Sequence, residues 1–340
     1  MSLTKLAYEI ASKIARPLGL EARIEEMAIR LAASRKTARV PGAPHLIWIE
    51  PTSTCNLNCI MCDRKAVSQR KVGFMDFELF TKIVDEAASL GVLQIEMGLG
   101  GEPLLHPRLT SMIEYAKNKG LMVGFNTNAN LLDEQKSRAL LDSKLDSIIF
   151  SVDGASKETY EKIRLKGDYD IVTKNIKKFL SLKKEMGLVK PKTTLQTIVM
   201  KGTENEVGAV IDMWRPLVDE VSVIAATEYG NVRRLSLVHR DQNSPKIPCY
   251  LLWCSQSVLH NGDVTVCCND IGGELVIGNI QENSLKNLWN GKKISEMRRT
   301  LKKRTLEKIP RCNSCEIINV DLIRRKKAIV SEVTRMARKG

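Results

Sequence analysis

Six short apolar runs alternate with helix-like segments through the first two thirds of the chain. Each run is rich in β-branched or aromatic residues, which is typical of strands buried on both faces of a parallel sheet. The predicted strands are residues 46–50, 92–99, 121–127, 147–152, 194–200 and 221–226, and the predicted helices are 76–90, 106–119, 133–142, 156–163, 169–186 and 204–215. This (βα)6 alternation predicts an α/β fold with a partial barrel over residues 45–230, for which 340 residues are long enough.

Three cysteines stand close together directly after the first predicted strand. Cys55, Cys59 and Cys62 form a CxxxCxxC spacing inside the stretch TSTCNLNCIMCDR. Thiolates that converge in this way need a soft metal to neutralise them. In a 4Fe–4S cluster three cysteines leave one iron open to a further ligand, whereas structural zinc usually takes paired CxxC motifs. The spacing therefore favours an iron–sulfur cluster that takes part in chemistry.

Polar or glycine-rich residues also follow the later predicted strands. A β/α barrel carries its chemistry at the C-terminal ends of its strands. Glycine lets the backbone approach a ligand closely, and Glu102 offers a carboxylate to an ammonium group. Alone, GGEP is most often a tight turn and SVDG a strand-to-helix loop, but their positions predict a ligand site. The strand-end residues are Gly100, Gly101, Glu102 and Pro103, then Asn126 to Asn128, Ser151 to Gly154, and Asn205 with Glu206.

A second group of cysteines begins where the alternation ends. It includes a hairpin-like stretch with a turn at Asn261 to Asp263 and a later CxxC. Residues 245–316 contain few large apolar residues, so we expect a small cysteine-rich α+β domain that a metal stabilises. An odd total of nine cysteines, in clusters and without an export signal, favours metal sites in the cytoplasm over disulfides. The cysteines of this group are Cys249, Cys254, Cys267, Cys268, Cys312 and Cys315.

The two ends of the chain carry a different pattern. Residues 1–44 have apolar positions at helical spacing and predict an amphipathic helical extension that caps the main domain or docks on a membrane or partner. Residues 292–340 hold 16 Lys and Arg against 5 Asp and Glu, so +11 of the net charge of +14 lies there. We expect the basic helix 317–340 to meet an anionic partner or a membrane surface, or to be solvated. Nucleic acid is disfavoured because interleaved aromatic residues are missing.

The CxxxCxxC motif after the first strand resembles the signature of the radical S-adenosylmethionine (radical SAM) enzymes. The resemblance implies a 4Fe–4S cluster on Cys55, Cys59 and Cys62 whose open iron binds the amino and carboxylate groups of SAM. An electron from the cluster then cleaves SAM to a 5′-deoxyadenosyl radical, which abstracts a hydrogen atom from the substrate. GGEP resembles the motif that receives the SAM amino group, and SVDG resembles the family's SxDG stretch near the ribose. The SAM-binding residues so implied are Met61, Gly100, Gly101, Glu102, Asn126, Ser151, Asp153, Arg164 and Asn205.

The C-terminal cysteines resemble the SPASM/twitch extension of a large branch of these enzymes. Gly262 stands five residues before Cys267, and a CxxC follows, but no cysteine follows Cys315 as a full SPASM domain would require. The resemblance therefore implies one auxiliary 4Fe–4S cluster of the twitch type. Its expected ligands are Cys254, Cys267, Cys312 and Cys315, with Cys249 or Cys268 as substitutes, and a structural zinc site is the alternative.

The expected reaction follows from the auxiliary cluster. A cluster that accepts an electron from a substrate radical makes the net reaction an oxidation, which also requires a base. The candidates for that base are Glu228, Tyr229, Arg233 and Asp270. We predict oxidation or epimerisation of a small metabolite such as a sugar, an aminoglycoside or a phosphorylated compound, with flavodoxin or ferredoxin as reductant. The alternatives are a peptide- or protein-modifying maturase, an enzyme acting on a lipid or membrane-associated substrate, and a metal-stabilised nucleic-acid-binding protein.

Overall fold

The structure is a computed structural model, and it describes residues 38–40, 42–226, 249–313, 315, 327–328, 330–332 and 334. Most of the expected N-terminal extension lies outside these residues, as do the candidate bases Glu228, Tyr229 and Arg233. Of the expected basic helix, only the short pieces from residue 327 onward are described, and they are helical. In the described part of the chain no helix is both long and apolar enough to cross a membrane.

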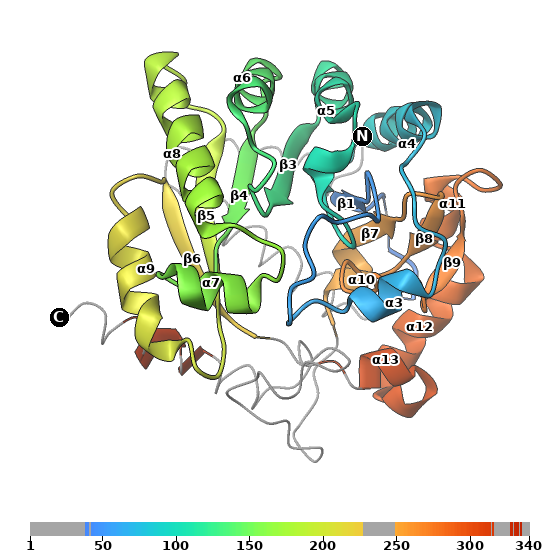
Figure 1. The fold of residues 1–340 in the computed structure, drawn as a ribbon. Coiled ribbons are helices and arrows are strands. Elements are labelled where there is room, and N and C mark those ends of the chain that lie inside the picture. The colour runs from blue at the N-terminus through green and yellow to red at the C-terminus, as the bar shows by residue number, and fades with distance from the viewer. Residues whose placement is uncertain are drawn as a thin grey trace, which may run out of the picture.

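One nine-stranded sheet runs through the molecule (Figure 1). Its strands β1 to β6 lie side by side in chain order and are all parallel, so the α/β class and the six-strand alternation are confirmed. The bounds are β1 Leu46–Ile49, β2 Gln94–Met97, β3 Met122–Thr127, β4 Ser147–Ser151, β5 Lys192–Val199, β6 Glu220–Ala225, β7 Ser255–Val258, β8 Asp263–Thr265 and β9 Val276–Asn279.

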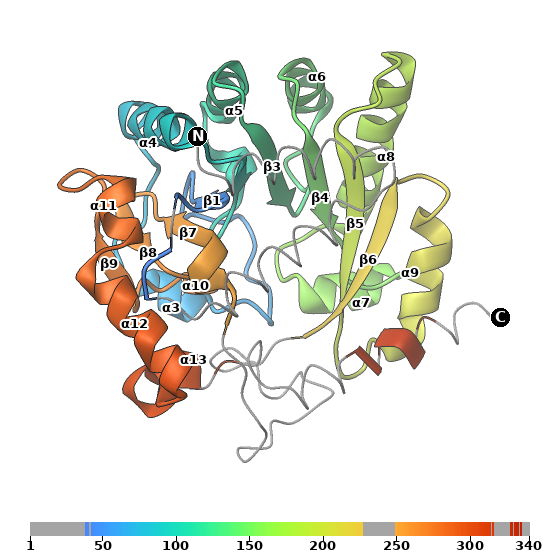
Figure 2. The ribbon, with the colours of Figure 1, turned by 180° about the vertical axis from the view of Figure 1, so that it is seen from behind.

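Helices from the connections between these strands cover the outer side of the sheet (Figures 1 and 2). Two of the predicted caps are confirmed, since Asp133 accepts from the backbone N–H of Lys136 at 2.7 Å and Ser156 from that of Thr159 at 3.2 Å. The helices are α3 Arg64–Ser68, α4 Phe77–Leu90, α5 Leu109–Asn118, α6 Glu134–Asp142, α7 Lys157–Ile163, α8 Tyr169–Glu185 and α9 Val207–Trp214, with 3-10 turns η2 Pro103–Leu105 and η3 Glu204–Glu206.

The two faces of the sheet differ in polarity. On the outer face, Ile47, Ile95 and Val123 are buried in the main apolar cluster together with side chains of α4, α5 and α8. Successive strand residues point to opposite faces, so the intervening positions line the inner, concave face. On that inner face Trp48, Glu96, Gly124 and Ser147 stand opposite one another in register across four strands, so a carboxyl and a hydroxyl lie in one row.

The cysteine-rich region continues the same sheet. Strand β7 runs parallel to β1, with Trp48 opposite Ser257, and β8 and β9 then add antiparallel pairs. The predicted turn at 261–263 does join two strands, but the first of them extends the barrel sheet beyond β1, which the sequence did not indicate. The helices of this region are α10 Leu251–Cys254, α11 Leu285–Trp289, α12 Lys292–Lys303 and α13 Pro310–Asn313, with the 3-10 turn η5 Leu306–Lys308.

One arginine of the basic C-terminal part belongs to the core. Arg298 of α12 is fully buried, its Nε donates to the carbonyl of Leu252 at 2.9 Å, and its guanidinium lies 4.4 Å from the centre of the Trp289 ring. Burial lowers the pKa of Arg298 to about 10. The net charge of this segment therefore overstates the positive charge that it presents at the surface.

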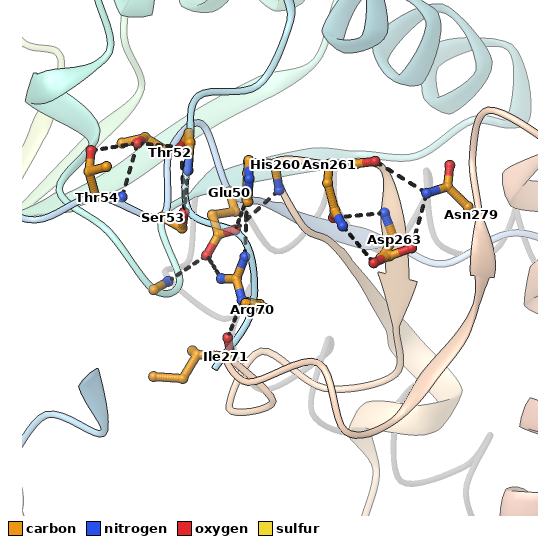
Figure 3. A network of polar contacts seen from close by, with 12 residues as sticks. Glu50, Thr52, Ser53, Thr54, Arg70, His260, Asn261, Asp263, Ile271 and Asn279 are labelled. Carbon is orange, nitrogen blue, oxygen red and sulfur yellow. Dashed lines mark hydrogen bonds and ion pairs between the residues drawn. The ribbon is translucent and has the colours of Figure 1, made fainter. Parts of the chain in front are cut away.

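A buried carboxylate joins the end of β1 to three other segments (Figure 3). Glu50 is fully buried, forms an ion pair with Arg70, and accepts from the backbone N–H groups of Gly100 and His260, each at 3.1 Å. The ring Nδ1 of His260 lies 3.1 Å from the same carboxylate, and Arg70 Nε donates to the carbonyl of Ile271 at 2.8 Å. Glu50 thus connects the first cysteine loop, the GGEP loop, the β7–β8 hairpin and the loop after Cys268.

The charge of Glu50 is compensated inside the protein. Burial by itself would raise the pKa of Glu50, but hydrogen bonds from His260 and Arg70 and the charge of Arg70 outweigh it and hold the pKa below its usual value. The carboxylate is therefore ionised at neutral pH and matched by a nearby cation. Removing one partner from such a buried pair leaves an uncompensated charge, which costs more than the pair itself contributes.

We predict that Glu50→Gln destabilises the protein by about 3 kcal/mol, because Arg70 then keeps a largely buried charge without its partner. The measurement is the urea midpoint of the anaerobically reconstituted protein, compared with wild type. The matched control is Glu134→Gln on α6, which removes the same charge from an ion pair with Arg138 whose side chains are about half exposed. An exposed pair contributes about 0.5 kcal/mol, so this variant should stay close to wild type.

The same reasoning gives a pH dependence. A carboxyl with a lowered pKa stabilises the folded state above its unfolded pKa and stops doing so as the pH falls through the folded pKa. The difference in stability between wild type and Glu50→Gln should therefore be constant near neutrality and shrink in acid, below the ordinary glutamate pKa. A difference that is the same at all pH values would contradict the role given to the Glu50 charge.

Candidate functional site

The first cysteine loop lies at the carboxyl end of β1 and is anchored through its backbone. The N–H groups of Asn58 and Ile60 donate to the carbonyls of Leu165 and Ile163 at 3.0 and 2.9 Å, which ties the loop to the end of α7. Cys55 and Cys59 are half-buried and Cys62 is exposed. The loop is therefore held between the first and fourth strands while its thiols stay accessible from the edge of the sheet.

The surroundings of Cys59 suit a metal ligand. Burial raises the pKa of Cys59, the charge of Arg164 opposes this, and Cys55 and Asp153 raise it further, so Cys55 lies close enough to act on it electrostatically. A bound metal deprotonates its coordinating thiols and replaces their mutual repulsion by attraction. Within the described residues no three potential ligands stand close enough to hold a metal ion as they are placed. The donor set nevertheless fits an iron–sulfur cluster, since three soft thiols share one anchored loop.

The GGEP loop is packed directly against the first cysteine loop. A Cβ atom at Gly101 would lie 2.1 Å from the carbonyl oxygen of Thr52 and 2.5 Å from that of Thr54, which only glycine permits. The backbone N–H of Glu102 donates to the carbonyl of Thr54 at 2.8 Å. The two motifs that the sequence singled out therefore form one continuous backbone surface.

The Glu102 side chain joins the second and third strand ends. It is 3% exposed and accepts from the N–H of Leu104 at 3.1 Å, the hydroxyl of Thr127 at 2.7 Å and the N–H of Asn128 at 2.8 Å. Burial raises the pKa of Glu102 despite these hydrogen bonds. A carboxylate offers about four acceptor positions, so three protein donors leave little capacity for the SAM ammonium group expected from the sequence. The contacts of Glu102 hold the GGEP loop against the end of β3.

Asn126 presents an acceptor to the inner face. It lies near the end of β3, and its side-chain Oδ1 is buried with no hydrogen-bond partner among the described residues. A buried polar atom without a partner costs about 1–3 kcal/mol, which a bound ligand relieves. Ser151, at the end of β4, and Met61, which packs against Ile163 and Met200, are half-buried nearby in the fold. The structure thus keeps all three at the edge where the sequence placed them.

In the SVDG motif the aspartate pairs with the predicted arginine. Asp153 is fully buried and accepts from Nε and Nη2 of Arg164 at 2.9 and 2.8 Å, and from the backbone N–H of Ile198 at 2.7 Å. Burial alone would lower the pKa of Arg164, but the charges of Asp153 and Cys59 raise it. Arg164 therefore remains a cation beside the thiol of Cys59, where it favours the thiolate form.

Glu206, rather than Asn205, organises the loop after the fourth strand. Its carboxylate accepts from the N–H groups of Ala155 and Ser156 at 2.6 and 3.2 Å and from the hydroxyl of Thr159. Asn205 is exposed on the 3-10 turn η3. An acidic residue that caps a helix 50 positions earlier leaves no local sequence signal, so only the fold reveals this contact.

The second cysteine group is gathered in one place. All six of its cysteines belong to or pack against the main apolar cluster. Burial raises the pKa of Cys249 well above its usual value, and Cys267, Cys315 and Cys312 raise it further. Burial and the thiols of Cys315 and Cys267 raise the pKa of Cys312 to about 12. Cys249 thus lies within electrostatic range of Cys267, Cys312 and Cys315, and both Cys249 and Cys254 act on Cys268.

Asp270, expected as a candidate base, lies in a closed network. It is 1% exposed and accepts from the N–H groups of Glu274 and Leu275 at 2.9 and 2.8 Å and from the hydroxyl of Thr265. Nε of Arg311, the residue before Cys312, lies 3.5 Å from Oδ1 of Asp270. These contacts make Asp270 the residue that shapes the loop after Cys267 and Cys268.

Comparison with known proteins gives relatives of several activities. The chain is 32% identical over 158 residues to the tungsten-containing aldehyde ferredoxin oxidoreductase cofactor-modifying protein of Pyrococcus furiosus, covering 46% of this chain and 44% of the relative. It is 32% identical over 167 residues to a probable GTP 3′,8-cyclase of Methanococcus maripaludis, covering 49% and 54%. It is 33% identical over 124 residues to the PqqA peptide cyclase of Gluconobacter oxydans, covering 36% and 34%. The chain thus matches about half the length of these relatives or less.

Solved structures share the fold over a larger part of the chain. Streptococcus suis SuiB bound to its precursor peptide SuiA has a TM-score of 0.65 at 16% identity, covering 86% of this chain and 80% of that one. BtrN in complex with AdoMet and 2-DOIA has a TM-score of 0.52 at 18% identity, covering 80% and 92%. At such identities these likenesses show the fold alone.

Two family models account for both cysteine groups. The radical SAM superfamily model matches residues 49–213, and the SPASM iron–sulfur cluster-binding domain model matches residues 249–316. The first domain implies a 4Fe–4S cluster that binds SAM. The second implies that the second cysteine group binds auxiliary iron–sulfur clusters. The chain therefore belongs to the radical SAM superfamily, in the branch that carries a SPASM/twitch domain.

Proposed function

We propose that this chain cleaves SAM reductively and abstracts a hydrogen atom from a residue in a peptide or protein. The observation that carries the proposal is a second cysteine group built onto the β1 edge of the radical SAM sheet. The same domain pairing underlies the likeness to SuiB, which was solved with a precursor peptide, and a peptide cyclase is among the sequence relatives. This moves the peptide-modifying alternative ahead of the small-metabolite prediction.

The residues of the first site divide into two roles. Cys55, Cys59 and Cys62 would hold the cluster, which supplies an electron to SAM when both are bound. Arg164 keeps a positive charge beside Cys59, and Gly101 allows close backbone packing under the cysteine loop. The unpartnered Asn126 Oδ1 would accept a hydrogen bond from SAM. Flavodoxin or ferredoxin would be the external reductant.

A small metabolite is the second candidate substrate. The observation in its favour is the matched stretch of 167 residues shared with a probable GTP 3′,8-cyclase, which is longer than the stretch shared with the peptide cyclase. The fold of BtrN, solved with the small molecule 2-DOIA, points in the same direction. Both candidates use the same first step, and they differ in what occupies the inner face of the sheet.

For the auxiliary cluster we propose Cys249, Cys267, Cys312 and Cys315 as ligands. This set keeps three of the residues expected from the sequence and takes Cys249 in place of Cys254. The support is electrostatic, since Cys249 lies within interaction range of the other three thiols. Cys254, whose Sγ lies 3.8 Å from the carbonyl of Leu251 in its own helix, acts on Cys268 and is the alternative fourth ligand.

We expect the anaerobically reconstituted and reduced protein to convert SAM to 5′-deoxyadenosine, measured by liquid chromatography. Cys59→Ala should reduce this formation to background, because the cluster then loses one of its three protein ligands. The control is Asn58→Ala in the same loop, whose side chain is exposed and which should retain cleavage. Cleavage by the Cys59→Ala variant at the wild-type rate would refute the assigned cluster site.

Iron analysis tests the auxiliary ligands. The wild-type protein should bind about eight iron atoms per chain, and Cys249→Ser should bind about four, because one 4Fe–4S cluster is lost. Cys254→Ser is the matched control and should keep about eight. If Cys254→Ser binds about four iron atoms and Cys249→Ser about eight, Cys254 is the ligand. If the wild-type protein binds about four iron atoms and one zinc ion, the proposed auxiliary 4Fe–4S cluster is wrong.

The substrate class can be tested with an extract of the organism that encodes the chain. The material that stimulates 5′-deoxyadenosine formation should stay inside a dialysis membrane and be destroyed by protease treatment, because a peptide or protein carries the reacting residue. If the stimulating material passes through the dialysis membrane and survives protease treatment, the substrate is a small metabolite.

A further inference from the structure

A further, half-buried carboxyl group lies on the inner face of the sheet. Glu96 of β2 stands opposite Trp48 of β1 on one side and Gly124 of β3 on the other. A Cβ atom at Gly124 would lie 2.7 and 2.9 Å from the two carboxylate oxygens of Glu96 and 2.3 Å from the hydroxyl of Ser147. The glycine therefore leaves the space that the Glu96 carboxylate and the Ser147 hydroxyl occupy.

This carboxyl differs from the buried acids Glu50, Glu102 and Asp153 in how few partners it has. Its one hydrogen-bond partner among the described residues is the side-chain amide of Gln94 on the same strand. Burial raises the pKa of Glu96 to about 7, with the amide of Gln94 acting in the opposite direction. No cation on a described strand compensates it, since Lys192, on the same face, forms its ion pair with Glu220 at 2.6 Å.

Other polar groups in the same row also lack partners. Ser257 of β7 is fully buried, and its hydroxyl has no hydrogen-bond partner among the described residues. The indole Nε1 of Trp48, directly opposite Ser257 in the sheet register, is likewise buried and unpartnered within that part of the chain. Each such atom costs about 1–3 kcal/mol unless a ligand or water pairs with it. Unpartnered buried atoms also occur at Trp214 and Trp289 in the core, so the observation that matters here is their occurrence in one row beside Glu96.

The chemistry of the row selects the kind of ligand. Glu96 accepts hydrogen bonds, Trp48 Nε1 can only donate, and the serine hydroxyls do both. An ammonium or hydroxyl group satisfies Glu96, and a neighbouring ligand oxygen satisfies the indole. A phosphate or carboxylate would instead face the Glu96 carboxylate with no described strand cation to balance it.

We propose that Glu96, with Trp48, Ser147 and Ser257 around it, binds an ammonium or hydroxyl group of the substrate on the inner face of the sheet. The proposal rests on the proposed function, because it assumes that the substrate binds on the inner face of the sheet. It applies to a peptide side chain that carries an amine or hydroxyl group and equally to an amino alcohol. It places no phosphate group of the substrate at Glu96.

The probe is trans-4-aminocyclohexanol, which carries both an ammonium and a hydroxyl group on a compact ring. Its binding to the reconstituted, SAM-bound protein is measured by calorimetry, beside trans-4-hydroxycyclohexanecarboxylate, which replaces the ammonium by a carboxylate. Wild type should bind the amine and reject the acid. Glu96→Gln, which keeps the shape and removes the charge, should weaken amine binding at least about tenfold.

Glu220→Gln is the matched control, because it removes a carboxylate from the same face that is already paired with Lys192. It should leave amine binding as in wild type. Any of three results would overturn the proposal. Glu96→Gln could bind the amine as tightly as wild type does, wild type could bind the acid as tightly as the amine, or wild type could bind neither probe. If wild type forms 5′-deoxyadenosine in these cases, only the inferred role of Glu96 is wrong. If wild type forms no 5′-deoxyadenosine, the proposed function itself is contradicted.

Discussion

The buried Glu50 carboxylate is the interaction on which the relation between the two cysteine groups depends. It ends β1, the strand that has β2 on one side and β7 on the other. A charge at such a position is tolerated only with full compensation, and its direct partners come from three different segments. Arg70 and Gly100 belong to the first site, and His260 and Ile271 lead into the second. The requirement to satisfy one carboxylate therefore fixes both loops against the same strand end.

Close backbone packing also holds the loops at the carboxyl ends of the strands together. Gly101 brings the GGEP loop against Thr52 and Thr54, and Glu102 then joins that loop to the end of β3. Asp153 connects the fourth strand end to β5 and, through Arg164, to the surroundings of Cys59. The motifs after successive strands are thus linked side to side. Their buried acids hold the edge of the sheet in shape, and the cysteine loop rests on the edge so formed.

How much the sequence could predict depends on how local each signal is. The strands, helices and the caps at Asp133 and Ser156 follow from patterns a few residues long, and the structure agrees with them. The β1–β7 pairing and the contact of His260 with Glu50, which are 210 positions apart, carry no such pattern. Likewise, a lone histidine reads as structural or surface until its partner is known. The proposal of Cys249 in place of Cys254 likewise depends on the fold, because both are spaced acceptably from the later CxxC motif.

Four acids at the strands and strand ends, three of them buried and Glu96 half-buried, show how hydrogen-bond satisfaction separates structural from ligand-binding groups. Glu50, Glu102 and Asp153 each receive three or more donors or an arginine from the protein, so their hydrogen-bonding capacity is mostly used within the fold. Glu96 receives one amide, keeps a raised pKa and lies in a row with the unpartnered Trp48 and Ser257. Folding alone gives no reason to retain a carboxyl group there, since a neutral residue of that size would avoid the desolvation cost. A substrate that supplies the missing donor does give a reason.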